Sequence, residues 1–234
     1  MHRTRTSLLV WFWSIYLVSN DKRETSAAQL SKKFGISYPT AWLMLHKIQK
    51  AMGDRDENYF LHMIVEMDDT LIGAPTEGGK RGRGTEKTKA MASMSLNKFG
   101  HPLYLKMNVV EDIKGSTLSK VASKAIAPGA AVSTDLFRSY NQLGKDVYTH
   151  LLQEFNYDDN PDHLMWLHTL ISNAKAFIAG TYHGLGAKHL QSYLDEYCYR
   201  FNRRNFKGQL FIRLLHACTS ACTITYDELV ARSC

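Results

Sequence analysis

Three short apolar segments, divided by glycine, proline and charge clusters, constrain the fold of this 234-residue chain most strongly. They occupy residues 62–68, 90–96 and 104–110. Segments of this length that are apolar or alternating in character are typical of strands in a sheet. A helical pattern follows over residues 117–127, and a further apolar strand over 131–134. Strands followed by a helix and then another strand predict an α/β layer architecture.

An apolar run over residues 8–18 opens the chain, and Arg3 and Arg5 precede it as basic residues precede the core of a secretory signal. The run is too short to span a membrane, and no small-residue cleavage site follows it. We therefore expect a buried helix here and no association with a membrane.

Helix-capping residues follow this run. Ser26 and Gln29 have the spacing of a capping box, so a short helix should begin after Ser26. Gly35 permits the left-handed turn that stops it, and Ser37 can cap a third helix over residues 38–52. One face of this third helix is apolar and holds Ala41, Leu45, Ile48 and Met52. The opposite face holds Thr40, Leu43, His46, Lys47 and Lys50.

Two short helices joined by a glycine turn, the second with a polar and basic outer face, indicate a helix-turn-helix. A generic helical hairpin is the alternative. In a helix-turn-helix, the start of the second helix approaches base edges and later lysines hold phosphates. The predicted base-reading residues are Ser37, Tyr38 and Thr40, and the predicted phosphate-binding residues are Lys47 and Lys50.

A glycine-rich, basic segment lies over residues 77–89, between the first two predicted strands. We expect a mobile loop along a phosphate backbone, with Lys80, Arg81 and Arg83 as DNA contacts. A solvated hairpin tip is the alternative. The net charge of +7 and the pI of about 9.2 favour a polyanionic partner such as nucleic acid.

All four cysteines lie in the last fifth of the chain and lack the C-x-x-C spacing of structural zinc sites. We interpret them as reduced thiols of a cytoplasmic protein.

Two aspartates follow apolar strand-like runs, Asp68 after residues 63–67 and Asp135 after 131–134. Ligands of α/β sheets collect at the carboxyl ends of strands, so two carboxylates placed there could share a hard metal ion. Aspartates that end strands are also common turn formers, and the pattern alone leaves both interpretations open.

The surroundings of these aspartates resemble a family. Residues 65–73 (VEMDDTLIG) and 133–140 (STDLFRSY) are similar to the first and second catalytic aspartate segments of the DDE-type transposases of the insertion sequence 1595 family. Residues 180–183, 188–196 and 199–204 (GTYH, KHLQSYLDE and YRFNRR) are similar to the end of the same domain. The resemblance extends over about residues 8–204, and its final block is the most specific part.

This resemblance implies a ribonuclease-H-like mixed sheet flanked by helices and preceded by a small all-α helix-turn-helix segment. It implies two Mg²⁺ or Mn²⁺ ions, strand cleavage and strand transfer, with Asp68 and Asp135 as metal ligands. His168 stands where the family has its third acidic residue, and would be both a catalytic residue and a metal ligand. Lys175 lies seven residues further, on the same helical face, and would hold a phosphate. The alternative for His168 is a buried, satisfied histidine beneath Trp166.

The expected division is residues 1–57 as the helix-turn-helix segment, 58–205 as the catalytic domain and 206–234 as an unassigned tail. The expected partners are double-stranded DNA at the element's terminal repeats and at the target, together with further copies of the chain. The expected location is the bacterial cytoplasm, bound to the nucleoid. Related transposases carry a zinc ribbon before the helix-turn-helix, which this sequence is expected to lack.

Two other functions stay open at this point. One is a DNA-binding regulator or a catalytically inactive transposase remnant, which would use the helix-turn-helix alone. The other is a metal-dependent nuclease of similar fold that never joins ends.

Overall fold

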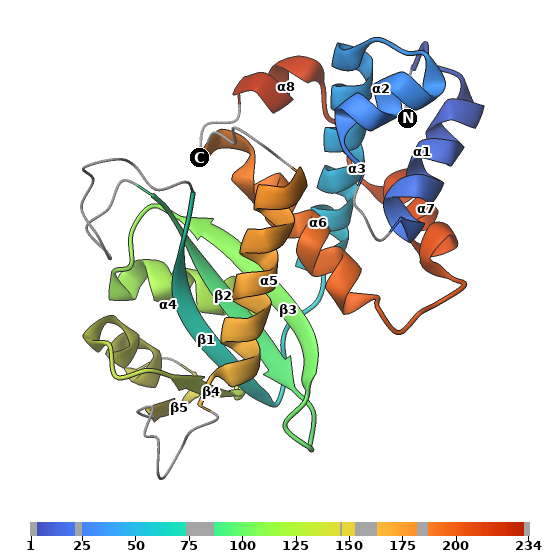
Figure 1. Cartoon of the computed structure of the whole chain (residues 1–234). Coiled ribbons are helices and arrows are strands. Elements are labelled where there is room, and N and C mark those ends of the chain that lie inside the picture. The colour runs from blue at the N-terminus through green and yellow to red at the C-terminus, as the bar shows by residue number, and fades with distance from the viewer. Residues whose placement is uncertain are drawn as a thin grey trace.

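A computed structural model describes residues 4–21, 25–73, 87–145, 147–152, 163–181 and 187–231. Its five strands form one sheet in the order β3-β2-β1-β4-β5 (Figure 1). The strands are β1 (Ile64–Ile72), β2 (Thr88–Leu96), β3 (Pro102–Val110), β4 (Ala131–Thr134) and β5 (Thr149–Leu152). The first three are antiparallel neighbours, whereas β4 runs parallel to β1 and β5 parallel to β4. This mixed order is ribonuclease-H-like, which confirms the predicted fold class.

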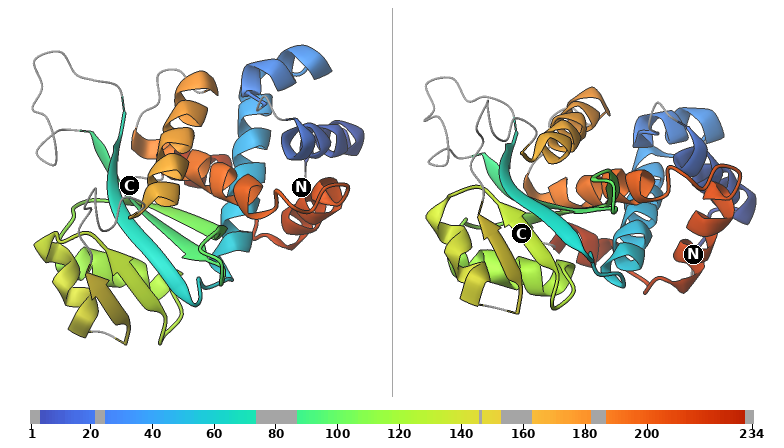
Figure 2. Two further views of the ribbon diagram at one scale, coloured as in Figure 1. Left: turned by 60° about the horizontal axis from the view of Figure 1, so that its bottom comes forward. Right: turned by 90° about the horizontal axis from the view of Figure 1, so that it is seen from below.

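Helices cover both faces of the sheet, and the turned views of Figure 2 separate the two layers. Helix α4 (Gly115–Ala125) lies on one face, and α5 (Met165–Thr181) and α6 (Leu190–Asn202) lie on the other. Side chains alternate between faces along a strand. Val65 and Met67 of β1 accordingly pack in the core on the α4 side, whereas Ile72 packs in the core beneath α5 and α6.

Helix α6 covers β3, an edge strand of the sheet. The Asn202 side chain accepts a hydrogen bond from the Leu105 amide (2.7 Å) and donates one to the Leu105 carbonyl (3.0 Å). The Gln191 side chain likewise accepts from the Val109 amide (2.7 Å) and donates to the Met107 carbonyl (2.9 Å). Exposed edge groups of a sheet invite pairing with another chain. Helix α6 therefore provides hydrogen-bond partners, within the molecule, for backbone groups at this edge of the sheet.

The predicted N-terminal helices are confirmed as α1 (Leu8–Asn20), α2 (Ala27–Phe34) and α3 (Tyr38–Glu57). Ser26 and Gln29 form the expected capping box, Gly35 adopts a left-handed φ of 63°, and Ser37 caps α3. The tail left unassigned from the sequence forms α7 (Leu210–Ser220) and α8 (Tyr226–Ala231). Helix α7 packs with α1 and α3 in one hydrophobic cluster, so the C-terminal region supports the helix-turn-helix.

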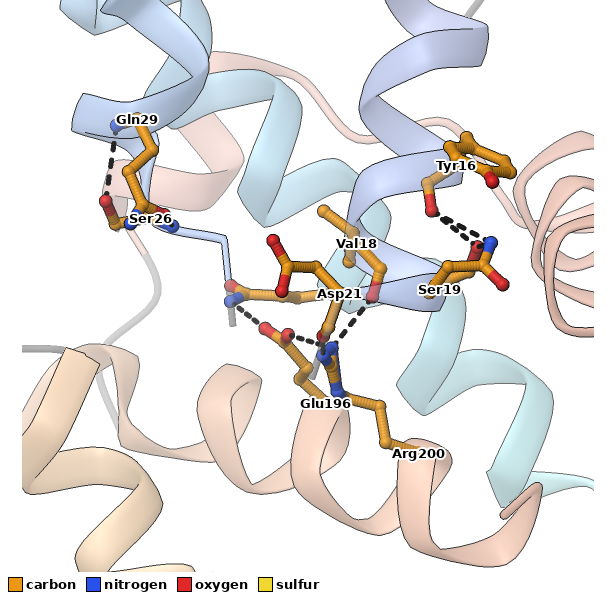
Figure 3. A network of polar contacts seen from close by, with 10 residues as sticks. Tyr16, Val18, Ser19, Asp21, Ser26, Gln29, Glu196 and Arg200 are labelled. Carbon is orange, nitrogen blue, oxygen red and sulfur yellow. Dashed lines mark hydrogen bonds and ion pairs between the residues drawn. The ribbon is translucent and has the colours of Figure 1, made fainter. Parts of the chain in front are cut away.

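Polar contacts from α6 join the N-terminal helices to the sheet region. The Glu196 carboxylate is fully buried and accepts a hydrogen bond from the Gln49 side chain of α3 (2.9 Å). Arg200, one turn further, donates to the Val18 carbonyl (2.8 Å) and to the Asp21 carbonyl at the end of α1 (Figure 3). A cation at a helix C-terminus complements the helix dipole and satisfies terminal carbonyls. The end of α1 is thereby fixed to α6.

Three expectations are corrected. The first helix is buried on one face only, because Leu9 and Trp13 are 63% and 50% exposed on the other. His46, predicted on the polar face of α3, is 1% exposed because the α3 surface it belongs to packs toward α6. Strand β1 continues to Ile72 through pairing with β2, so Asp68 lies within the strand and not at its end.

No helix in the described ranges is both long and apolar enough to cross a bilayer.

His46 gives the fold a predictable response to acid. Its ring packs against Trp42, His189 and Tyr193, and its pKa is lowered to about 4 by burial and by the nearby charge of His189. The unfolded chain binds this proton near pH 6.5 and the folded chain does not, so stability falls as pH drops below 6.5. Because only the unfolded chain protonates His46 in this range, we expect the free energy of unfolding to fall by about 2 kcal/mol between pH 7 and pH 5.

Urea titrations of the wild type and of His46→Phe, which keeps an aromatic ring, measure this contribution. The variant should lose less stability on acidification than the wild type. Equal losses in the two proteins would contradict this role of His46.

Candidate active site

Asp68 and Asp135 come from neighbouring parallel strands. In the register of β1 and β4, Glu66 lies opposite Ser133. Asp68 lies two residues beyond Glu66, and Asp135 lies two residues beyond Ser133, directly after β4 ends. Continuing that register places the two aspartates side by side, with their backbones about 4.8 Å apart. The fold thus brings together the two carboxylates that the sequence predicted.

His168 lies in the first turn of α5 and contacts Asp68. Its Nε2 is 3.0 Å from the Asp68 Oδ2, across 100 residues of sequence. The His168 side chain is 57% exposed and that of Asp68 is 15% exposed. Since Trp166 is itself exposed, the alternative of a histidine buried beneath Trp166 is wrong. His168 therefore faces both the carboxylate and the solvent.

Lys175 lies about two helical turns beyond His168 on α5 and is exposed. Its pKa is lowered by partial burial and by the charge of Lys87, and these effects are opposed by the carboxylate of Asp68. Lys175 is thus within electrostatic range of Asp68, the residue that His168 contacts.

The sequence prediction missed Glu66, which lies two residues before Asp68 on the same face of β1. Burial raises the pKa of Glu66 to about 7, and nearby His168 and a hydrogen bond from the Leu167 amide oppose the shift. Its Oε2 is buried and has no hydrogen-bond partner among the residues described. The period-two spacing from Asp68 is the signal that would have identified this residue.

His163 was also missed. It is 8% exposed, and its Nε2 lacks a hydrogen-bond partner in the described part of the chain. Burial and the charge of His168 lower its pKa, and Asp135 opposes this. Leu164, next along the chain, has a left-handed φ of 55°, which costs a leucine about 1–2 kcal/mol. The chain turns there directly into α5.

The surroundings of Asp68 disfavour the charged form of its carboxyl group and raise its pKa. Burial is the largest cause that raises its pKa, followed by the charge of Asp69, and the hydrogen bond to His168 opposes both. Carboxylate oxygens and an imidazole nitrogen are suitable ligands for Mg²⁺ or Mn²⁺. Within the described ranges, no three His, Cys, Asp or Glu side chains converge closely enough to hold one ion. The donors are therefore of the right kind, although as they lie they do not converge on a single position.

The predicted DNA-binding residues occupy three kinds of position. Ser37, Tyr38 and Thr40 lie at the start of α3, where Tyr38 is exposed and Ser37 and Thr40 share a hydrogen bond of 2.8 Å. Lys47 is half-buried further along α3. Lys50 is paired with Asp54 at 2.5 Å, so binding a phosphate would require it to leave that ion pair.

Lys80, Arg81 and Arg83 lie outside the described residues, and so does part of the motif block 180–183. Their predicted roles stay predictions.

A cavity of about 590 Å³ lies elsewhere, between α3, α6 and β3. Asp56, Glu57, Lys106 and Asp195 are among its lining residues, and none of the predicted catalytic residues is. The chemistry-bearing side chains instead face the open surface beside α5, which suits a large substrate better than an enclosed small molecule.

The part of the chain that holds the sheet is similar to transposases. A family model described as an ISXO2-like transposase domain matches residues 60–202, a range that contains all four predicted catalytic residues. An uncharacterized transposase-like protein of Haemophilus influenzae is 26% identical over 106 residues, covering 44% of this chain and 85% of that protein.

Two solved structures show a distant likeness. The Mos1 mariner paired end complex with Mn matches with a TM-score of 0.33 and 12% identity, over 94% of this chain and 80% of that one. The simian T-cell lymphotropic virus intasome in complex with PP2A regulatory subunit B56 gamma matches with a TM-score of 0.35 and 11% identity, over 86% and 67%.

The raised pKa of Glu66 predicts the stability of the metal-free protein. The folded value of about 7 exceeds the ordinary 4.5, so Glu66 binds its proton more tightly in the folded chain, and stability is lost as pH rises from 4.5 through 7. In chelator at pH 8, we expect Glu66→Gln to be more stable than the wild type by about 2 kcal/mol. Urea unfolding at pH 8 and pH 5 tests this, because the gain should largely vanish at pH 5. A gain that is the same at both pH values would argue against this origin.

Proposed function

The chain belongs to the ISXO2-like transposase domain family, and from this premise we propose that it cleaves DNA at the ends of an insertion sequence and joins those ends to a target. The observation that carries the proposal is the 3.0 Å contact between Asp68 on β1 and His168 on α5, with Asp135 after the neighbouring strand. His168 and Asp135 lie 100 and 67 positions from Asp68 in sequence, yet α5 and the strand next to β1 carry them to the same part of the sheet.

We assign distinct tasks to the side chains. Asp68 and Asp135 would hold divalent ions through carboxylate oxygens, and His168 would complete the set with an imidazole nitrogen or orient a water molecule. When bound, two Mg²⁺ or Mn²⁺ ions supply activation of the attacking oxygen and stabilisation of charge on the phosphorus. Lys175, exposed on the same side of α5, would position the phosphate beside the scissile bond.

The N-terminal helices would select the DNA. We propose that residues 1–57 read the terminal repeats of the element through the start of α3, where Ser37, Tyr38 and Thr40 lie. Lys47, the segment with Lys80, Arg81 and Arg83, and the net charge of +7 would supply phosphate contacts. Residues 58–205 would then carry the chemistry. Cleaving two ends of one element in concert would require a homo-oligomer on the DNA of the bacterial nucleoid.

A nicking assay on an oligonucleotide that carries the repeats flanking the encoding element tests the proposal. We expect Asp68→Asn to lower metal-dependent cleavage by a factor of 100 or more, on the order seen when a catalytic group is removed. DNA binding should be unchanged, because α2 and α3 are untouched. Asp69→Asn is the matched control: its carboxylate faces the other side of β1, toward the Tyr140 hydroxyl at 3.4 Å, and cleavage should persist.

The same assay separates the alternatives. DNA binding by the wild type without metal-dependent cleavage would favour a regulator or an inactive remnant. Cleavage without any joined product would favour a nuclease.

Metal preference tests the role of His168. Imidazole suits Mn²⁺ better than Mg²⁺, which prefers oxygen ligands. We expect Mn²⁺ to support cleavage better in the wild type. His168→Glu should lower the ratio of Mn²⁺-supported to Mg²⁺-supported rates, on the order of tenfold. If the ratio is the same in both proteins, His168 is not a ligand.

A further inference from the structure

We propose that Glu66 is a further metal-binding residue of the active site and supplies, from strand β1, the third carboxylate that position 168 lacks. This inference rests on the proposed function, because it concerns the same divalent ions. No sequence motif assigns a role to Glu66, and three features of its surroundings support this one.

The first feature is its position on the strand. Glu66 and Asp68 are two residues apart on β1, so their side chains leave the same face about 6.6 Å apart at the Cα atoms. The ions of a two-metal site lie about 3.5–4 Å apart. Two carboxylates with this spacing on one strand can therefore reach adjacent ions, and the extra methylene group of Glu66 extends its reach.

The second feature is the state of the Glu66 carboxyl group. The Leu167 amide, at the start of α5, hydrogen-bonds to it, and His168 lies within electrostatic range. Its Oε2 is buried with no hydrogen-bond partner in the part of the chain that the structure describes. A buried acceptor left unpaired costs about 1–3 kcal/mol. One hydrogen bond thus holds the Glu66 carboxyl group in place, while its buried Oε2 makes no hydrogen bond to the described residues and is the atom that a cation would pair with.

The third feature is a second unpaired atom at the same site. His163 is more than nine-tenths buried, and its Nε2 has no hydrogen-bond partner within the described ranges. The ring is within electrostatic range of both His168 and Asp135. Two buried polar atoms without a partner in the described ranges, the Glu66 Oε2 on β1 and the His163 Nε2 before α5, therefore both belong to residues within electrostatic range of His168, which contacts Asp68. A cation bound beside His168 would give both atoms a partner.

Glu66 has an alternative role, which is to anchor the N-terminus of α5. A carboxylate near a helix N-terminus is stabilising in its own right. Glu66→Gln separates the two roles because an amide oxygen accepts the same hydrogen bond from Leu167 but carries no charge for a cation. If anchoring is the only role, the substitution leaves metal affinity unchanged.

The test is calorimetric titration of the full chain, stripped of metal, with Mn²⁺. We expect Glu66→Gln to weaken Mn²⁺ binding by about 10-fold or more. Asp69→Asn removes a carboxylate one residue away on the opposite face of β1, and should weaken binding by less than about 3-fold. Thermal unfolding gives a second readout: Mn²⁺ should raise the melting temperature of the wild type and of Asp69→Asn, but much less that of Glu66→Gln. Folding of each variant is checked by circular dichroism.

Asp68→Asn distinguishes the failure of this inference from that of the proposed function. If Asp68→Asn abolishes Mn²⁺ binding and Glu66→Gln behaves like Asp69→Asn, the role of Glu66 is overturned and the proposed function stands. If the wild type binds Mn²⁺ no better than Asp68→Asn, both fail.

Discussion

Coverage of strand β3 by helix α6 is the constraint on which the rest of the structure depends. One side of α6 provides Gln191 and Asn202 to the open backbone groups of the strand. The other side packs on α3, where Glu196 is buried against Gln49. Removing one side of a buried hydrogen bond leaves the other group less well satisfied, which is costly. Asn202 also donates to Asp56 of α3 (2.9 Å), so one side chain links the sheet edge to the helix-turn-helix. The N-terminal helices and the sheet are consequently held in one arrangement.

This arrangement determines where chemistry is possible. Helix α5 packs on the sheet through a stripe of residues that includes Leu167, Ile171 and Ala174. His168 and Lys175 lie along the border of that stripe, because each directly follows one of its members. The border runs beside the exposed part of β1, and the pairing of β1 with β4 brings Asp135 to the level of Asp68. The result is an open surface that carries acidic, histidine and lysine side chains.

Most of the fold could be predicted from local patterns. Strand alternation, the capping box at Ser26 and the left-handed turn at Gly35 depend on neighbouring residues alone, and all are confirmed. What failed depends on tertiary packing. The burial of His46 arises from α6, which lies far away in sequence, and the length of β1 from its pairing with β2. Of the candidate site, Asp68 and Asp135 were predicted from strand-like runs and family resemblance, and His168 from the resemblance alone. Glu66 and His163 stand out only through buried atoms that lack a hydrogen-bond partner in the described part of the chain.

Glu66 and His163 also lower the stability of the fold. The Glu66 Oε2 and the His163 Nε2 are buried and have no hydrogen-bond partner among the residues that the structure describes, which destabilises the fold, and so does the left-handed backbone at Leu164. A scaffold that only contacts DNA gains nothing from these costs, since uncharged or apolar side chains would fill the same positions with a more stable result. Such costs are concentrated where a protein binds a ligand or performs chemistry, because the missing interactions are supplied there by the ligand. Here they lie beside Asp68 and Asp135, on the side of the sheet that α5 leaves partly open. The physical cost of these positions is therefore of the kind that a bound ligand offsets.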